Sequence, residues 1–122
     1  MFTLTAETVE QIHDDLLGPN ELPGRARDKS LDAALARVEN RLAYGMIDDA
    51  FDLAAAYAMA IARGHCFNDG NKRTAFRSMQ ICLLAHDIHH DFDTEEVGQK
   101  IIALAQGLID DGDLAEWLRD TA

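Results

Sequence analysis

Residues 51–87 read FDLAAAYAMAIARGHCFNDGNKRTAFRSMQICLLAHD, and this stretch decides the fold. Its two ends are rich in apolar residues, so residues 48–64 and 72–87 are each predicted to form a largely buried helix. Gly64 ends the first of these helices, as glycine commonly does. The short polar loop between them is therefore held at both ends by buried helices.

Four further helices are predicted around this central pair. The helical patterns and their stop signals place them at 5–18, 31–45, 94–107 and 114–120. Residues 88–93, IHHDFD, alternate weakly and are predicted to be a short strand or an extended link. No repeat or interdomain linker interrupts the pattern, so residues 1–122 are expected to fold as one all-α domain, a compact bundle with the helix–loop–helix at its middle.

Polar residues at the helix starts support these boundaries. Thr5 and Ser30 stand where a hydroxyl can accept a hydrogen bond from the first turn. Two spaced acidic pairs resemble capping boxes for the last two helices, Asp93 with Glu96 and Asp113 with Glu116. His13 lies beside Asp14 and Asp15 and is predicted to be on the surface.

The composition limits the classes of function. The net charge is −11, with 22 acidic and 11 basic residues, which argues against direct nucleic-acid binding over most of the surface. No apolar run reaches the length of a membrane span, and the first residues lack the pattern of a secretory signal, so a cytoplasmic location is expected. Cys66 and Cys82 are too few for a disulfide framework and are predicted to be free thiols, with Cys82 in the core.

The loop GHCFNDGNKRTA, residues 64–75, combines features that suit an anion. Gly70 permits a tight turn, and the helix that follows offers unpaired N–H groups and the positive end of its dipole. Lys72 and Arg73 add two cations at the same place, and Phe67 can anchor the loop in the core. These parts predict a phosphate cradle.

Two further side chains of the loop suit phosphoryl or nucleotidyl transfer. Asp69 offers a hard oxygen ligand, and Mg²⁺ bound with phosphates commonly takes only one or two carboxylates. His65 can act as a general base near neutral pH. Asn71 or Asp69 is expected to cap the following helix. The residue types alone also fit an ordinary turn before a helix, so a structural interpretation stays open at this point.

The order of the residues adds a resemblance. HCFNDGNKR, residues 65–73, resembles the signature loop of the Fic/Doc family, H-x-F-x-[DE]-[AG]-N-[GK]-R. The similarity continues in ELPG at 21–24, in the segments 28–45 and 51–65, and in LAEWLRD at 114–120. Over nearly its whole length the chain looks like the Doc-type, or death-on-curing, toxins of this family.

This resemblance implies an all-α fold that binds ATP and Mg²⁺ at the signature loop. By position, His65 would take the proton from a target hydroxyl, Phe67 would anchor the loop and Asp69 would hold Mg²⁺. The residues implied to bind the nucleotide or its phosphates are Asn68, Gly70, Asn71, Lys72 and Arg73, of which Lys72 and Arg73 also assist transfer, with Arg63 as a weaker candidate.

Two departures separate the loop from the AMP-transferring Fic pattern, G-N-G-R-x-x-R. Lys72 replaces the second glycine, and Phe76 replaces the second arginine. Both changes match the Doc branch, which transfers the γ-phosphate of ATP to a threonine of elongation factor Tu and stops translation. Arg77 shares a helix face with Arg73 and could partly restore the lost clamp, so AMP transfer remains the alternative.

The resemblance also bears on partners. The self-inhibitory Fic motif [ST]-x-x-x-E-[GN] has no match in the chain, and the Doc branch is instead restrained by a separate antitoxin. A second alternative is therefore an antitoxin-binding corepressor with little catalysis. The intact His65, Asp69 and Arg73 weigh against it.

Two other features carry weaker hypotheses. HDIHHDFD, residues 86–93, holds ligand types that a metal could use, but its spacing matches no zinc pattern and an exposed polar connection is favoured. A redox role for Cys66 is not favoured, because the sequence gives no environment that would lower its pKa.

Overall fold

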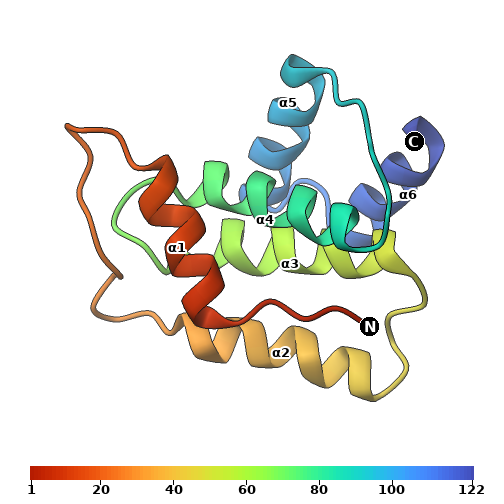
Figure 1. Ribbon diagram of the computed structural model, residues 1–122, viewed down its shortest axis with the longest axis horizontal. Coiled ribbons are helices and arrows are strands. Elements are labelled where there is room, and N and C mark those ends of the chain that lie inside the picture. Colours follow the sequence, from red (N-terminus) through yellow and green to blue (C-terminus); the bar gives the residue numbers. More distant parts are fainter.

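The computed structural model describes residues 1–122 and consists of six helices without a strand (Figure 1). The helices are α1 (Ala6–Leu16), α2 (Leu31–Ala43), α3 (Ala50–Gly64), α4 (Asn71–Ala85), α5 (Thr94–Ala105) and α6 (Asp111–Thr121). The predicted all-α architecture is confirmed. None of the six helices is both long enough and apolar enough to cross a membrane.

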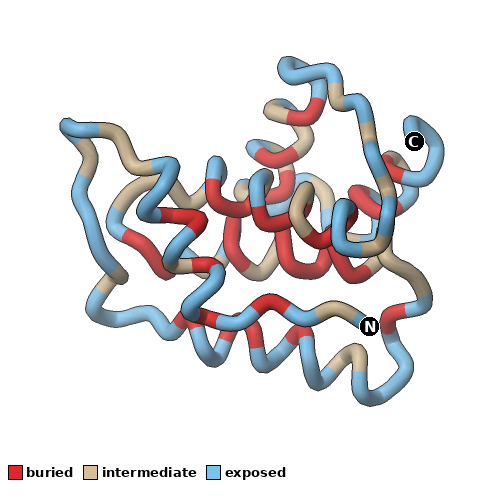
Figure 2. Tube along the Cα trace, in the orientation of Figure 1, coloured by how far each residue is buried: buried red, intermediate tan, exposed pale blue.

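The central pair, α3 and α4, forms the core of the molecule (Figures 1 and 2). Small residues let other helices approach α3 closely, and three consecutive alanines, Ala54, Ala55 and Ala56, are fully buried. Burial of α3 on nearly every side is what its continuous apolar sequence predicts. The loop between α3 and α4 therefore starts and ends on fixed elements.

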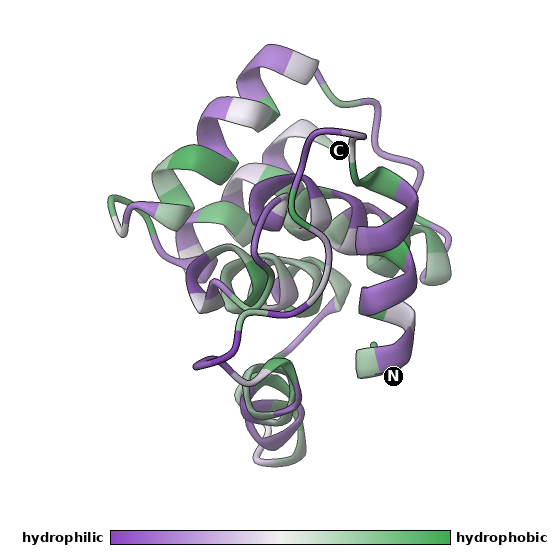
Figure 3. Cartoon of the chain, turned by 90° about the vertical axis from the view of Figure 1, so that its left-hand side faces the viewer, coloured by the Kyte–Doolittle hydropathy of each residue, from purple (hydrophilic) through white to green (hydrophobic).

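The other helices surround this pair. α1 packs on α4, α2 and α6 pack on α3, and α5 packs on both central helices. Figure 3 shows hydrophilic and hydrophobic residues on each of these helices, as expected for amphipathic helices with one buried face. The N-terminal segment is fixed as well, since the backbone N–H of Leu4 donates a buried hydrogen bond of 3.0 Å to the hydroxyl of Tyr57.

Most predicted helix starts are confirmed. The side chains of Thr5, Ser30 and Asp93 each accept a hydrogen bond from the first turn of their helix. The predicted box Asp113–Glu116 is wrong, because α6 begins earlier and its capping box joins Asp110 to Asp113. Only half of the predicted box Asp93–Glu96 forms, because the Glu96 carboxylate accepts a hydrogen bond from the Trp117 indole instead.

Residues 86–93 form an irregular link without a strand, so the extended-link alternative holds. The imidazole of His90 stacks on Phe92 with 4.0 Å between ring centroids, and its Nε2 lies 2.8 Å from the Thr121 hydroxyl. Burial lowers the pKa of His90, which keeps this histidine neutral and packed. The contact between His90 and Thr121 therefore holds the link to α6.

Candidate functional site

The loop of residues 65–70 leads from α3 into the N-terminus of α4. His65 is the residue at which α3 ends, and its backbone is left-handed, with φ of 49°. This conformation is uncommon for a residue with a side chain, although histidine adopts it more often than most. The imidazole is exposed and has no hydrogen-bond partner in the chain, so both ring nitrogens are free to meet a ligand.

Phe67 holds the middle of the loop in the core, with only 3% of its surface exposed. The side-chain amide of Asn71 makes two hydrogen bonds to the backbone of Phe67. Its Oδ1 accepts the Phe67 N–H at 3.0 Å, and its Nδ2 donates to the Phe67 carbonyl at 2.9 Å. The ring of Phe67 stacks on the imidazole of His13, with 3.9 Å between the centroids and 7° between the planes. The loop is thus fixed from α1 and from α4.

The start of α4 presents a row of free N–H groups. The first backbone bond of this helix runs from the Thr74 N–H to the Gly70 carbonyl, and the N–H groups of residues 70–73 have no acceptor in the chain. Gly70 makes this turn with φ of 78°, where a side chain would be strained. Four free donors at a helix N-terminus, beside the cations Lys72 and Arg73, form a cradle for an anion.

The expected side-chain cap of α4 is absent, and the prediction that Asn71 or Asp69 caps this helix is wrong. The amide of Asn71 is taken by Phe67. The carboxylate of Asp69 accepts the Leu22 N–H at 2.8 Å instead. Because neither side chain turns back onto the helix, the N–H groups of the cradle remain available.

Asp69 is the only carboxylate in the loop, and it is held at two points. Its Oδ2 accepts the Leu22 N–H, and its backbone carbonyl lies 2.7 Å from Nε2 of His13. The second carboxylate oxygen has no hydrogen-bond partner in the chain. Mg²⁺ bound with phosphates commonly takes only one or two carboxylate ligands from the protein. Asp69 fits this requirement, because it is a fixed carboxylate with a free oxygen next to the anion cradle.

The connection between α1 and α2, residues 17–30, lies along the loop. Residues 24–26 pair with residues 66–68 as a short antiparallel ladder, in which the Ala26 N–H donates to the Cys66 carbonyl at 2.8 Å and the Asn68 N–H donates to the Gly24 carbonyl at 3.2 Å. The side chain of Asn68 donates to the Pro23 carbonyl at 2.9 Å. Asn68 therefore holds this connection and does not point its amide into the cradle.

The connection also brings a carboxylate to the cradle. Glu21 forms an ion pair with the guanidinium of Arg73, which donates a second hydrogen bond to the Leu16 carbonyl at 3.2 Å. The Arg73 hydrogen bond holds the pKa of Glu21 below its usual value, and the Gly18 N–H contributes in the same direction. Lys72 is exposed and has no such partner. One of the two cations is therefore engaged by an internal anion.

An apolar cleft opens beside the two cations. It lies between α4 and α5, has a volume of about 260 Å³ and is lined by Lys72, Arg73, Phe76, Thr94, Val97, Gly98, Ile101 and Ile102. Phe76 contacts Phe92 edge to face, at 5.4 Å between ring centroids. The cleft offers apolar surface directly next to the anion cradle.

Two of the arginines considered from the sequence make their hydrogen bonds outside the loop. Arg63 donates to the carbonyls of Leu104 and Ile109, at 2.9 and 2.5 Å, and so joins α3 to the end of α5. Arg77 donates to the side chain of Gln80 at 2.7 Å. Neither guanidinium is bonded to a residue of the signature loop.

Sequence reasoning missed two residues of this site. His13 was predicted to be on the surface, which is wrong, because it is 1% exposed and packs under the loop. A signal existed, since Ala6, Val9 and His13 follow helical spacing and all three are buried. Glu21 stands in a polar connection without periodicity, and no local pattern indicates its contact with Arg73.

The two cysteines are both buried and free. Burial raises the pKa of the Cys66 thiol and raises that of Cys82 to about 12. A high pKa keeps both sulfurs protonated and unreactive at neutral pH. The redox role for Cys66 therefore gains no support from its surroundings.

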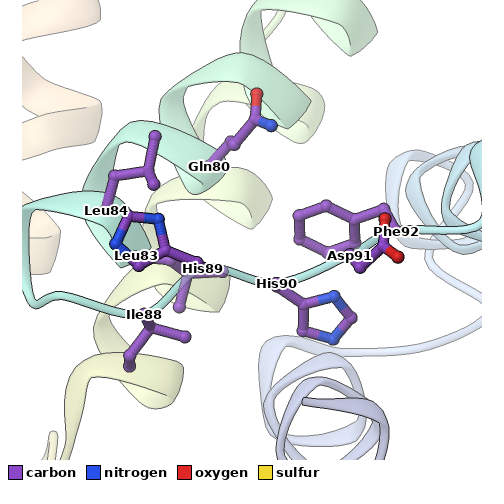
Figure 4. A pocket seen from close by; sticks show the side chains of 8 residues that line it. All are labelled: Gln80, Leu83, Leu84, Ile88, His89, His90, Asp91 and Phe92. Atoms are coloured by element: carbon purple, nitrogen blue, oxygen red, sulfur yellow. The ribbon is translucent and has the colours of Figure 1, made fainter.

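The far end of α4 holds a second cavity of about 260 Å³, between this helix and the 86–93 link (Figure 4). His89, His90 and Asp91 are among its lining residues, and Figure 4 shows His89 and His90 on different sides of it. No three His, Cys, Asp or Glu side chains of residues 1–122 come together as a metal site. The metal hypothesis for HDIHHDFD therefore has no geometric support.

Two comparisons with known proteins match most of the chain. The sequence model of the Fic/DOC family matches residues 3–83, a span that contains α1 to α3, the signature loop and most of α4. A protein of Escherichia phage P1, "Protein kinase doc", is 35% identical over 117 residues. The aligned region covers 95% of this chain and 92% of the phage protein.

Proposed function

Because the chain belongs to the Fic/DOC family, we propose that it is a Doc-type toxin that transfers the γ-phosphate of ATP to a hydroxyl of a protein. The similar phage protein is named a protein kinase, and the similarity extends over nearly the full length of both chains. The proposed acceptor is a threonine of elongation factor Tu, and the proposed consequence is arrest of translation.

One observation carries this proposal. A free histidine, a fixed carboxylate and four unpaired N–H donors lie within residues 65–73, at the N-terminus of one buried helix. Phosphoryl transfer needs little covalent chemistry from a protein, and it depends on positioning and on charge stabilisation. A loop that presents a base and an anion cradle on a rigid support offers both.

Each residue of the loop then has a role that its surroundings allow. The phosphates would bind at the N–H groups of residues 70–73, together with the side chains of Lys72 and Arg73. His65, whose ring nitrogens are unpaired, would accept the proton of the attacking hydroxyl. Asp69 would hold Mg²⁺, which when bound neutralises charge on the phosphates.

Arg73 must exchange partners for this to happen. Its guanidinium now binds Glu21, and an incoming phosphate would compete with that carboxylate for the same cation. The exchange is feasible, because the ion pair is partly exposed and such pairs contribute little net stability. Glu21 thus acts as an internal competitor of the nucleotide.

The apolar cleft between α4 and α5 supplies room for the rest of the nucleotide. Its walls are mainly side chains of α5, and Lys72 and Arg73 stand at its edge. A nucleoside in the cleft would place its phosphates beside these cations.

AMP transfer is the weaker alternative. It would need a second phosphate clamp one turn after Arg73, and Phe76 at that position packs against Phe92. Arg77 is the substitute considered from the sequence, and it is bonded to Gln80. Both contacts favour γ-phosphate transfer.

A cognate antitoxin is the proposed restraint on this activity, as in the Doc branch. The corepressor alternative, with little catalysis, is disfavoured because the free His65 and the unpaired donors of the cradle have no use in a binding module.

The reaction can be tested with ATP labelled in either the γ- or the α-phosphate. Purified protein is incubated with elongation factor Tu and Mg²⁺, with His65→Ala as the inactive control. The proposal expects label in elongation factor Tu from γ-labelled ATP only. Label from the α-position only would assign AMP transfer, and no label from either would refute a transferase acting on this target.

A further inference from the structure

His13 of α1 contacts the signature loop although it lies 56 residues away from Asp69 in the chain. It is 1% exposed, its ring stacks on Phe67, and its Nε2 lies 2.7 Å from the Asp69 carbonyl oxygen. A carbonyl only accepts hydrogen bonds, so Nε2 must carry the proton and donate. The ring also lies against the turn at Gly70, where an added Cβ would be 3.6 Å from its Cδ2.

The hydrogen bond sets the orientation of one peptide plane. The peptide between Asp69 and Gly70 is trans, so its carbonyl and its N–H point in opposite directions. With the carbonyl directed at the buried His13, the Gly70 N–H must point away from α1. That N–H is the first of the four unpaired donors of the cradle.

The other contacts of the loop do not set this plane. Asn71 grips Phe67, and Asn68 holds residues 23 and 24, so both act before Asp69. The Gly70 carbonyl accepts hydrogen bonds from the N–H and the hydroxyl of Thr74, but it belongs to the next peptide. Among the side chains of the protein, only that of His13 bonds to the Asp69 carbonyl.

We propose that His13 is a positioning residue of the transfer site, which orients the Asp69–Gly70 peptide so that the Gly70 N–H faces the phosphate and the Asp69 carboxylate stays at the cradle. This inference rests on the proposed phosphoryl transfer. It assigns to α1 a part in the reaction that no residue of the signature loop supplies. His13 touches neither nucleotide nor target, and it acts through the backbone of the loop.

Two substitutions separate the effect of losing the His13 hydrogen bond from the effect of losing the His13 ring. His13→Phe keeps an aromatic ring on Phe67 and removes the donor, whereas His13→Gln keeps a donor of similar reach and removes the ring. Leu118→Val is the matched control, because Leu118 is fully buried in α6, far along the chain from the loop. For each variant, kcat and KM for ATP are measured together with the thermal midpoint.

A positioning role predicts a loss in kcat for His13→Phe, on the order of 10- to 100-fold, as small misplacements of reacting groups can produce. His13→Gln should recover most of this loss, and Leu118→Val should lower the thermal midpoint without lowering kcat. Equal kcat values for His13→Phe and wild type would overturn the inference. So would equal losses for the two His13 variants, since restoring a hydrogen-bond donor would then recover no activity.

A second measurement uses the wild-type protein and does not depend on a variant that folds or on a known target. The ¹⁵N resonances of the His13 imidazole are followed by NMR while MgATP is added. The inference expects a protonated Nε2 whose resonance shifts as the nucleotide saturates. An unshifted resonance during saturation would contradict it, even if phosphoryl transfer is real.

The two hypotheses fail in different ways. If wild-type protein transfers no phosphate but binds MgATP with a shift at His13 Nε2, the proposed function fails and the positioning of the phosphate site stands. If wild type transfers phosphate and His13→Phe does so equally well, only the inference fails.

Discussion

Arg73 at the start of α4 is paired with Glu21 of the α1–α2 connection, 52 residues earlier in the chain. The pair joins the anion cradle to the segment that lies along the signature loop. It also occupies one of the two cations that a nucleotide would use. Because Glu21 belongs to the α1–α2 connection, the position of this connection determines whether Arg73 is free to bind an anion.

Removing this internal competitor should strengthen nucleotide binding. We expect Glu21→Gln to bind ATP several-fold more tightly than wild type, because Arg73 no longer has to leave a carboxylate. Titration calorimetry with ATP, without any target protein, measures the effect. Asp32→Asn is the control, since it removes an exposed ion pair of the same connection, with Arg25, away from the cradle. Unchanged or weaker binding by Glu21→Gln would show that the pair does not compete with phosphate.

Loss of the proposed base should remove the reaction and leave the fold. His65 is exposed and unbonded, while Phe67 and Asn71 still anchor the loop in its absence. We expect His65→Ala to lose activity by on the order of 10²–10⁴-fold, the usual contribution of a general base. Rates of phosphate transfer and thermal midpoints are compared. A purified variant with full activity would exclude His65 as the base.

The carboxylate of Asp69 should govern the response to Mg²⁺. Asp69→Asn keeps an oxygen that can accept the Leu22 N–H but removes the charge. We expect ATP binding by this variant to gain little from added Mg²⁺, whereas wild-type binding rises with it. Binding curves at several Mg²⁺ concentrations check this. The same Mg²⁺ dependence in both proteins would move the metal site to another residue.

The sequence was sufficient for the fold because its strongest signals are local. Local sequence is enough to predict the apolar helices α3 and α4. It is also enough to predict the residues that cap α1, α2 and α5. The candidate site residues of the loop could be predicted for the same reason, since the proposed base, the carboxylate and the cations all lie within residues 65–73.

The missed parts depend on contacts between distant residues. A histidine beside two aspartates suggests a surface position, and its partners Phe67 and Asp69 come from another part of the chain. The prediction of a side-chain cap for α4 is wrong because Asn71 and Asp69 accept hydrogen bonds from Phe67 and Leu22 instead. Local propensity does not indicate which of the competing N–H donors each side chain accepts from.

The side chain at position 72 should help to select which phosphate is transferred. Lys72 places a flexible cation at the edge of the cradle, where the AMP-transferring pattern has glycine. We expect Lys72→Gly to lose γ-phosphate transfer with little gain of AMP transfer, because Phe76 still provides no clamp. Lys72→Gly combined with Phe76→Arg should gain some AMP transfer. The two labelled forms of ATP distinguish these outcomes, and AMP transfer by the single variant alone would contradict the role of Phe76.

The intact mass of elongation factor Tu after incubation with the wild-type protein, ATP and Mg²⁺ tests the central claim most directly. Transfer of the γ-phosphate predicts a gain of about 80 Da, absent with His65→Ala, whereas transfer of AMP would add about 329 Da. A gain of the larger mass alone would contradict the account and make Arg77 the candidate for the missing clamp.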